Sequence, residues 1–329
     1  MRTEQDALLT VKRLNVAYET EEKNILALSD VSLTVHAGEI VAVLGESGSG
    51  KSTMARALVG LLPEGAVMHG DIAYGSHTIT DFDDDDRERI FARLRGRVVA
   101  SVFQETSGAL HPLIKLSRQM EDVLRQHFPH MIASEKKERM RRILELLALP
   151  ERAMSAYPHE LSGGQKQRAS LALALAARPS LLIADEITSA LDEKARHAVL
   201  DIINALAVFE KMGIVYITHE VDDIRTLCAK QVMVMFAGEW VEVGSSDLVS
   251  GGAMHPYTRR LLACDPARST PQTIITAGER VTSPLEGACP YYSACPRRTG
   301  FCRIEKPILA KVGEGHYVRC HYVEAESDE

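Results

Sequence analysis

The sequence predicts an α/β fold built around a parallel β-sheet. Residues 40–44, 181–184 and 214–218 are short runs of almost entirely apolar side chains, as is typical of strands buried on both faces. A helical pattern at 193–206 separates the last two runs, and this alternation of strand and helix indicates a parallel sheet. A glycine-rich loop follows the first run directly, where such folds place phosphate-binding turns.

Length and composition bound the remaining possibilities. The chain has 329 residues, of which 45% are hydrophobic and 25% are charged, with a formal net charge of −7. These values predict a folded domain with an extension or second domain, and they disfavour global disorder. The acidic balance gives no generic attraction to nucleic acid, so we expect no nucleic-acid partner. We expect neither a membrane-spanning helix nor a secretory signal, which places the chain in the cytosol.

The amino-terminal section, up to about residue 80, is predicted to be rich in strands. Residues 8–16 and 31–35 alternate apolar and polar side chains, the pattern of half-buried strands. Residues 71–80 predict another short strand. Between them, residues 53–62 predict a helix that ends before Pro63.

An acidic run at residues 81–86 allows two interpretations. Its carboxylates could form a calcium loop, but the glycine and the terminal glutamate of an EF-hand are not at the required spacing. The alternative is an exposed loop whose acidic side chains lie at the positive end of a helix at 87–94. We favour the exposed loop because runs of charge are weak signals of a site.

The second half of the chain changes character near residue 250. Residues 113–157 show helical spacing, and 193–206 predict another helix. After Ser250-Gly251-Gly252, prolines, paired arginines and cysteines replace the periodic patterns. We therefore expect one domain over residues 1–250 and an extension over residues 251–329.

The glycine-rich loop matches the phosphate-binding pattern G-x-x-x-x-G-K-[ST] in full. Its residues are Gly45, Glu46, Ser47, Gly48, Ser49, Gly50, Lys51 and Ser52, followed by Thr53. Backbone N–H groups of such a loop converge on phosphate oxygens at a helix N-terminus. Lys51 would reach the β- and γ-phosphates, and the Ser52 hydroxyl would bind Mg²⁺. The alternative, a strand–helix turn without a ligand, is disfavoured because strand, loop and helix occur in the required order.

A pair of acidic residues follows the second apolar run. Asp185 is suited to the Mg²⁺ shell, and Glu186 could activate the attacking water as a general base. An acidic pair at a strand end is common by itself. Combined with the glycine-rich loop, it predicts hydrolysis of a nucleoside triphosphate.

A third motif makes the prediction specific. Leu161-Ser162-Gly163-Gly164-Gln165-Lys166-Gln167-Arg168 closely resembles the signature of ATP-binding cassette (ABC) ATPases. Taken singly, a tyrosine more often packs in a core, a histidine is more often structural, and one glutamine carries no signal. The set occurs in family order over residues 8 to about 250. In that order Tyr18 resembles the aromatic that stacks on adenine, Gln104 the Q-loop glutamine, Asp192 the D-loop aspartate and His219 the switch histidine.

The resemblance implies an architecture and an incomplete site. It implies a RecA-like parallel core, an antiparallel β subdomain and a helical subdomain at about 105–165. In the family, the signature residues Ser162, Gly163, Gly164 and Gln165 face ATP held by another cassette. This chain has one loop and one signature, so it needs a second ATPase subunit, either a copy or a paralogue. Gln104 would join Ser52 and Asp185 around Mg²⁺, and His219 would contact the γ-phosphate.

Two positions depart from the family pattern. Ile187 follows Glu186 where the family usually has proline. His111 precedes Pro112 where peptide importers tend to have asparagine. Neither change removes a catalytic group. The second makes two predictions less specific: the assignment to a subfamily, and the surface that would contact a membrane partner.

Four of the six cysteines lie near the C-terminus. Cys289, Cys295, Cys302 and Cys320 are separated by five, six and seventeen residues, without a C-x-x-C pair. Spacing alone leaves a metal site, a cluster site and free thiols open. The segment beginning His255-Pro256-Tyr257-Thr258, with these cysteines, resembles the C-terminal extension of oligopeptide/dipeptide importer ATPases. That resemblance implies a [4Fe–4S] cluster; Cys228 and Cys264 are expected to be plain thiols.

The resulting functional prediction is an ATP-hydrolysing, nucleotide-binding subunit that powers ABC import of di- and oligopeptides. The resemblance implies ATP, Mg²⁺ and a [4Fe–4S] cluster as cofactors. It also implies two transmembrane permease subunits, an extracytoplasmic binding protein and a peripheral position on the cytoplasmic face of the membrane. Alternatives are a nickel or metallophore importer, a soluble ABC ATPase acting on ribosomes or DNA, and an assembly factor for iron–sulfur clusters.

Overall fold

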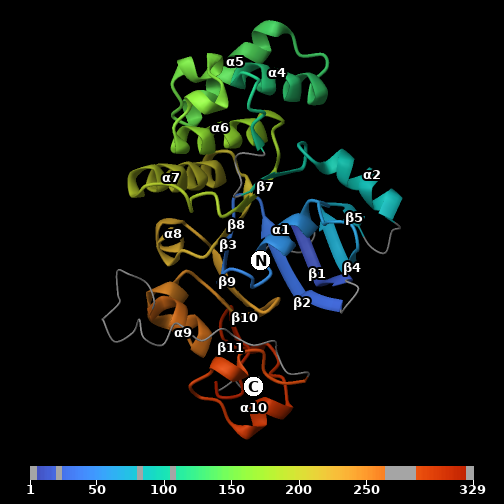
Figure 1. Cartoon of the computed structure of the whole chain (residues 1–329), viewed down its shortest axis with the longest axis vertical. Helices are drawn as coiled ribbons and strands as arrows, with labels where there is room; N and C mark the ends of the chain where they lie inside the picture. The colour runs from blue at the N-terminus through green and yellow to red at the C-terminus, as the bar shows by residue number, and fades with distance from the viewer. Residues whose placement is uncertain (1–5, 20–23, 80–83, 104–108, 264–286, 324–329) are drawn as a thin grey trace.

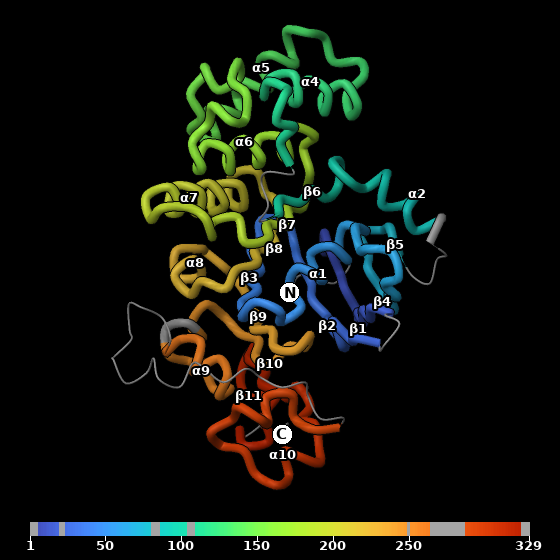
Figure 2. Tube along the Cα trace, in the orientation of Figure 1, coloured from blue at the N-terminus to red at the C-terminus, as the bar shows by residue number. Residues whose placement is uncertain are grey.

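The structure, a computed structural model, describes residues 6–19, 24–79, 84–103, 109–263 and 287–323 (Figures 1 and 2). In chain order the described elements are β1 (Ala7–Glu19), β2 (Asn24–His36), β3 (Ile40–Leu44), α1 (Lys51–Leu58), β4 (Ala66–Tyr74), β5 (His77–Ile79), α2 (Asp84–Leu94), β6 (Val99–Val102), α4 (Leu116–His127), α5 (Ala133–Leu146), η2 (Glu151–Ser155), η3 (Pro158–Glu160), α6 (Gly163–Ala176), β7 (Leu181–Asp185), α7 (Glu193–Phe209), β8 (Gly213–Thr218), α8 (Val221–Thr226), β9 (Gln231–Phe236), β10 (Glu239–Gly244), η4 (Leu248–Gly252), α9 (Pro256–Ala263), η6 (Tyr292–Ala294), α10 (Gly300–Ile304), β11 (Ala310–Gly313) and β12 (His316–Val318).

The central sheet has the order β11-β12-β10-β9-β3-β8-β7-β6 among the described strands. Pairing is parallel from β9 to β6, which confirms the predicted parallel core. Strands β10, β12 and β11 join antiparallel, so the complete sheet is mixed. The carboxyl ends of the parallel strands meet at one edge, where ligands bind in such sheets.

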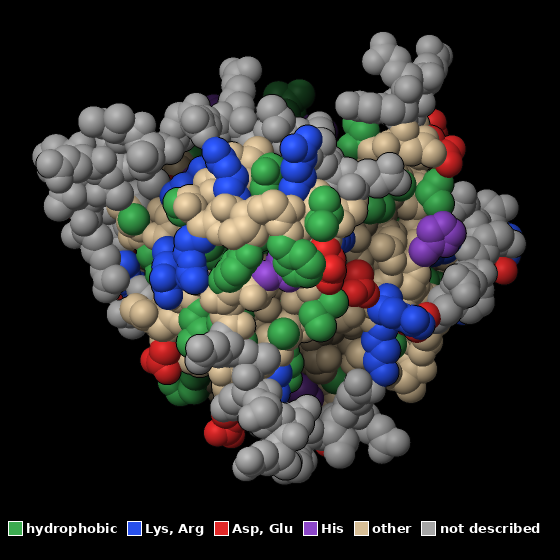
Figure 3. Space-filling view, turned by 90° about the horizontal axis from the view of Figure 1, so that it is seen from below, with side chains coloured by type: hydrophobic (Ala, Val, Ile, Leu, Met, Phe, Trp, Pro, Cys, Tyr) green, Lys and Arg blue, Asp and Glu red, His purple; other side chains and the backbone are tan. Residues whose placement is uncertain are grey.

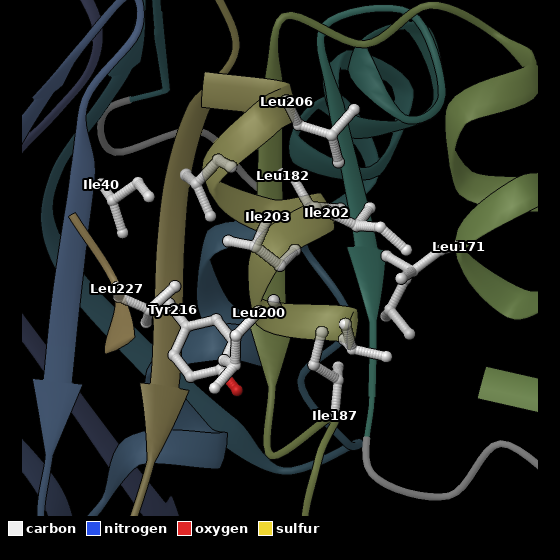
Figure 4. Close-up of a cluster of buried hydrophobic side chains, with 14 of the residues drawn as sticks. Ile40, Leu171, Leu182, Ile187, Leu200, Ile202, Ile203, Leu206, Tyr216 and Leu227 are labelled. Carbon is white, nitrogen blue, oxygen red and sulfur yellow. The ribbon is translucent and has the colours of Figure 1, made fainter. Parts of the chain in front are cut away.

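Alternating side chains divide the core between the two faces of the central sheet. Ile40, Ala42 and Leu44 of β3 pack into one apolar cluster, whereas Val41 and Val43 pack into the other. Figure 4 shows the first cluster, where the α7 side chains lie over β7 and β8. Burial on both faces explains why β3 and β7 read as continuous apolar runs in the sequence.

A separate antiparallel sheet has the order β2-β1-β4-β5 and lies beside the core (Figure 1). Its strands β1 and β2 are longer than the predicted 8–16 and 31–35, but they confirm the strand-rich start. The single strand predicted at 71–80 is instead part of a hairpin. Gly75, at φ +55°, turns the chain between β4 and β5, a conformation that glycine adopts readily.

Two predicted helix starts differ from the structure. Helix α1 begins at Lys51 and ends at Leu58, earlier at both ends than the predicted 53–62. Gly60, at φ +65°, follows its end, and a Cβ atom there would lie 2.2 Å from the Phe91 ring. Helix α2 begins at Asp84, so part of the acidic run is helical and its remainder, 81–83, lies outside the described residues.

Helices α4, α5 and α6 form a layer at one end of the molecule (Figure 1), and α4 and α5 lie within the range 113–157 for which helical spacing was predicted. Helix α6 begins at Gly163, within the signature motif. Arg139 of α5 donates to the carbonyls of Leu175 and Ala176, at the end of α6. This places a cation at the negative end of that helix and fastens the two helices together.

The C-terminal extension lies at the opposite end of the molecule (Figure 2) and returns to the central sheet. Glu242 and Val243 of β10 pair with Val318 and Tyr317 of β12. Seen from this end, the surface intersperses Lys and Arg with acidic and apolar side chains (Figure 3). In the ranges that the structure describes, no helix is long and apolar enough to cross a bilayer.

Candidate active site

The glycine-rich loop joins β3 to α1 at the carboxyl edge of the sheet. A Cβ atom at Gly45 would lie 2.5 Å from the Met235 carbonyl oxygen, and one at Gly50 would lie 2.8 Å from that of Ala27. Gly50 also has φ +108°. These positions require glycine because of close backbone approach and, at Gly50, its left-handed conformation. The loop thus meets the geometric demand of a phosphate cradle.

Lys51 is buried and folded back over this loop. Its Nζ donates to the carbonyls of Gly45 and Glu46, both at 2.8 Å, and lies 3.6 Å from Glu186 Oε1. Burial lowers the pKa of Lys51, and the charges of Glu186 and Asp185 oppose that shift. A cation held by weak carbonyl partners can be transferred to phosphate oxygens without the loop being rebuilt.

The predicted magnesium ligands Ser52 and Asp185 lie together. Asp185, at the end of β7, is 3% exposed, and its Oδ1 has no hydrogen-bond partner. Burial raises the pKa of Asp185, opposed by a hydrogen bond with the Ser52 side chain. A buried carboxylate oxygen without a partner, beside a hydroxyl, is a donor set that fits Mg²⁺. The third predicted ligand, Gln104, lies outside the described residues.

The predicted base and switch residues are in contact. Glu186 Oε2 lies 3.1 Å from His219 Nδ1, and His219 Nε2 lies 3.2 Å from Glu220 Oε1. Glu186 also has φ +50°, unusual for a residue with a side chain, and its N–H donates to the Ile217 carbonyl. Strain of this kind is characteristic of functional sites, where the surrounding structure holds it in place.

Lys51, Ser52, Glu186 and His219 line one cavity of about 830 Å³, whereas the buried Asp185 is not part of its wall. Tyr18 lines the cavity, and its hydroxyl lies 3.1 Å from Thr53 Oγ1 in the first turn of α1. The tyrosine predicted to stack on adenine is therefore adjacent to the start of this helix. The predicted residues in the wall are Tyr18, Glu46, Ser47, Gly48, Gly50, Lys51, Ser52, Thr53, Glu186 and His219. Sequence reasoning missed the contributions of Leu26 and Gly238, which belong to segments without a motif, and of Leu261, whose extension segment was not linked to this cavity.

The signature and D-loop residues start helices outside the described wall of this cavity. Ser162 Oγ accepts from the Gln165 N–H, and Gln165 Oε1 accepts from the Ser162 N–H, which caps α6. Asp192 caps α7 by accepting from the Ala195 N–H at 2.9 Å. The amino-terminal end of α6 is exposed at Ser162 and Gly163 and is not part of the wall of this chain's cavity.

A buried hydrogen-bond network next to the segments that carry Glu186 and His219 was not predicted from the sequence. Asp223 of α8 is fully buried, and its carboxylate accepts hydrogen bonds at 2.5–3.0 Å from Thr188, Tyr216, Thr218 and Arg196. Thr188 follows Glu186 by two residues, and Thr218 immediately precedes His219. One carboxylate therefore holds the chain segments that carry Glu186 and His219. No motif signals it, because its partners are 5 to 35 residues away.

The structure gives no support to the predicted cluster site. Cys289, Cys295, Cys302 and Cys320 are free thiols, and no group of three or more His, Cys, Asp or Glu side chains within the described ranges could hold a metal. Burial raises the pKa of Cys289 to about 11, with smaller contributions from the other three thiols. The four side chains are therefore close enough to interact but do not form a set of ligands. Cys264 lies outside the described residues.

Two regions of the chain match known protein families. Residues 28–189 match the ABC transporter family, and residues 241–302 match the oligopeptide/dipeptide transporter C-terminal region. The chain is 33% identical to the oligopeptide transport ATP-binding protein OppD of Escherichia coli, with 92% of this chain and 90% of that protein aligned. The dipeptide transport ATP-binding protein DppD of Escherichia coli is 32% identical, over 96% of this chain and 97% of that protein.

The chain spans about half the length of other relatives. It is 36% identical to OppD of Mycobacterium tuberculosis over 95% of this chain but 51% of that protein. Among solved structures, the dimeric ABC transporter cassette MJ0796 aligns with a TM-score of 0.64 and 29% identity, over 72% of this chain and 98% of that one. Together with the site geometry, these matches show that the chain belongs to the ATP-binding proteins of oligopeptide and dipeptide ABC transporters, a family of ATPases.

Proposed function

We propose that this chain is the nucleotide-binding subunit that hydrolyses ATP to power peptide import across the cytoplasmic membrane. The observation that carries the proposal is the cavity lined by Lys51, Ser52, Glu186 and His219, with the buried Asp185 hydrogen-bonded to Ser52. Support for a peptide cargo comes from the oligopeptide/dipeptide C-terminal match. Neither the nickel or metallophore alternative nor the soluble non-transport alternative has a matching observation.

The residues divide the chemistry between charge neutralisation and proton transfer. Lys51 leaves its two carbonyl partners and binds the β- and γ-phosphates. Ser52 and Asp185, with Gln104, would hold Mg²⁺, which supplies further charge neutralisation at the phosphates. Glu186 takes a proton from the attacking water, and His219, 3.1 Å away, orients that carboxylate. Phosphoryl transfer demands mainly this kind of positioning and electrostatic stabilisation.

A second cassette completes each site in this proposal. Ser162, Gly163 and Gly164 present the start of α6 away from this chain's cavity, ready for ATP held by a copy or a paralogue. Two permease subunits and an extracytoplasmic binding protein would make up the remainder of the importer. The chain would then lie on the cytoplasmic face of the membrane as a peripheral subunit.

The decisive experiment is Glu186→Gln, which keeps the shape of the side chain but removes its basicity. Steady-state hydrolysis should fall to background, while ATP binding persists and the closed cassette dimer accumulates. Glu145→Gln is the matched control, because Glu145 lies on the exposed face of α5, paired with Arg141. Unchanged turnover in Glu186→Gln would remove this residue from the role of base. The cargo is tested by ATP-dependent uptake of di- and oligopeptides, against Ni²⁺, in proteoliposomes containing the complete importer.

We also infer that the four extension cysteines bind iron as a [4Fe–4S] cluster. Support comes from the number of thiols and the family extension. The thiols must turn toward a common centre, because their described arrangement is not a ligand set. Anaerobic purification should yield a brown protein containing iron and acid-labile sulfide. A colourless protein with zinc, or with no metal, would overturn this assignment.

A further inference from the structure

Helix α9 of the C-terminal extension contacts the phosphate-binding loop directly. The Tyr257 hydroxyl accepts a hydrogen bond from the Glu46 N–H at 2.9 Å. The Arg260 guanidinium donates to Glu46 Oε1 at 2.6 Å. Leu261, the next residue, forms part of the wall of the nucleotide cavity. The loop is thus held by a segment more than 200 residues away in the sequence.

Of these two contacts, the tyrosine hydrogen bond is the more important. The Glu46 side chain is 47% exposed, so its ion pair with Arg260 is largely screened by water. Tyr257 is fully buried, and removal of its oxygen would leave a peptide N–H without its partner. Burial also raises the pKa of Tyr257, which keeps its hydroxyl neutral. We therefore assign the larger effect on the loop to Tyr257 and the smaller one to Arg260.

The position of Tyr257 is fixed by neighbouring rings. Its ring centroid lies 4.7 Å from that of Phe236 and 5.5 Å from that of Tyr291. The Arg260 guanidinium carbon lies 5.8 Å from the centroids of both tyrosine rings. Tyr257, Arg260 and Tyr291 form what we call the aromatic latch. Because Tyr291 lies between Cys289 and Cys295 in the sequence, the latch joins the cysteine-bearing segment to the loop.

We propose that the aromatic latch is a positioning element for ATP binding, through which the extension sets the conformation of the phosphate-binding loop. Glu46 is fixed at three points: its N–H by Tyr257, its carboxylate by Arg260 and its carbonyl by Lys51. Fixing this residue preorganises the following loop amides and the resting place of Lys51, which lowers the cost of ordering on binding. The proposal rests on ATP binding in this cavity and is independent of the transported compound.

The test compares Tyr257→Phe with Tyr317→Phe in the full chain. Tyr257→Phe keeps the ring packing and removes only the acceptor oxygen, whereas Tyr317 is a partly exposed tyrosine of the same extension. Titration with Mg·ATP should give a Kd roughly three- to tenfold higher for Tyr257→Phe, the range expected for one lost hydrogen bond. Tyr317→Phe should match the wild type. An unchanged Kd in Tyr257→Phe would overturn the proposal.

Measuring ATP hydrolysis by the assembled importer distinguishes a positioning role of the aromatic latch from a decrease in the amount of folded protein. A positioning role raises KM for ATP and leaves kcat within about twofold, because the Glu186–His219 pair is untouched. A lower kcat at unchanged KM would indicate a smaller active fraction and would overturn the proposal. Arg260→Gln provides a second variant, for which we expect a KM increase of about twofold that Arg260→Lys restores. Failure of the latch would leave the result of Glu186→Gln unaffected, so the two hypotheses are tested separately.

Discussion

Two fully buried carboxylates, Asp223 and Glu242, organise the cassette and its extension in different ways. Asp223 receives only side chains, including the cation Arg196 at 2.5 Å. Glu242, on β10, accepts from the backbone N–H groups of Met254 and His255 at 2.7 and 3.0 Å. His316 Nε2 of β12 lies 2.9 Å from the same carboxylate.

This difference in partners reflects a different structural role for the buried carboxylate in each region. In the cassette, Asp223 carries a paired charge that fixes the segments next to Glu186 and His219, and breaking such a pair leaves an uncompensated ion. In the extension, Glu242 joins the sheet to the chain entering α9 and to β12. Loss of the first should affect stability and chemistry together. Loss of the second should release the extension and weaken the aromatic latch on the loop.

The largest effect is predicted for Asp223→Asn. The amide removes the charge that neutralises Arg196 and cannot accept all of the hydrogen bonds that reach the carboxylate. We expect a loss of about 3–5 kcal/mol in the free energy of unfolding. The ATPase rate should fall as well, because the segments bearing Glu186 and His219 lose a common anchor. Urea unfolding and steady-state hydrolysis measure the two effects.

Asp222→Asn is the matched control for stability. Its side chain is 48% exposed and pairs with Arg225 at 2.7 Å on the surface of the same helix. A surface pair of this kind contributes about 0–1 kcal/mol. Equal destabilisation by Asp223→Asn and Asp222→Asn would show that the buried network stabilises the fold no more than a surface ion pair does.

Glu242→Gln should have an intermediate effect. The amide NH₂ group of glutamine would face a backbone N–H or the His316 ring, so at least one donor would lose its acceptor. We expect about 1–3 kcal/mol of destabilisation. Hydrogen exchange should increase at Met254 and His255, and KM for ATP should rise because α9 is less firmly held. Normal exchange there, with a normal KM, would separate Glu242 from the latch.

The local motifs were predictable because each is contained in a short segment of sequence. Strand β3 and the following loop require only a continuous apolar run and a fixed glycine spacing. Strand β10 was not predicted, because Glu239 and Glu242 interrupt its apolar pattern. Both are buried in the structure, where Lys306, Arg319 and His316 from the extension pair with them. Partners 67 to 80 residues away cannot be read from a local pattern.

In the candidate site, too, the features that were predicted are those contained in short segments of the sequence. The family motifs predicted Lys51, Asp185, Glu186 and His219, and the structure brings these residues together. The Tyr257 contact to the loop and the Asp223 network carry no motif, because each depends on tertiary packing. The predicted cysteine ligand set, by contrast, came from residue count and family resemblance, and neither fixes the directions of the thiol side chains.

A smaller effect is predicted for Tyr216→Phe, which sharpens the account of the cassette network. The Tyr216 hydroxyl donates to Asp223 and lies 2.9 Å from Thr188 Oγ1, at the edge of the apolar cluster in Figure 4. Removing it deletes one of four bonds to the carboxylate and retains the ring. We expect a loss of about 1 kcal/mol in the free energy of unfolding, with ATP binding preserved. If Tyr216→Phe lowered the free energy of unfolding as much as Asp223→Asn, the hydroxyl hydrogen bonds, and not the ion pair with Arg196, would provide most of the stability of the network.

The smallest effect concerns pH and the extension. Burial lowers the pKa of His255 to about 4, and its other charged or titratable neighbours are Arg319, Glu242 and Tyr291. Because the unfolded chain binds this proton near pH 6.5, stability from His255 falls as pH drops below that value. Between pH 7.5 and 6.0 the expected loss is about 0.8 kcal/mol.

The test is His255→Asn. His255 Nδ1 accepts a hydrogen bond from the Tyr257 N–H at 3.1 Å, and asparagine keeps an acceptor for this N–H but does not titrate. Urea unfolding at the two pH values should therefore show a shallower pH dependence in His255→Asn than in the wild type, and equal slopes would contradict the assignment.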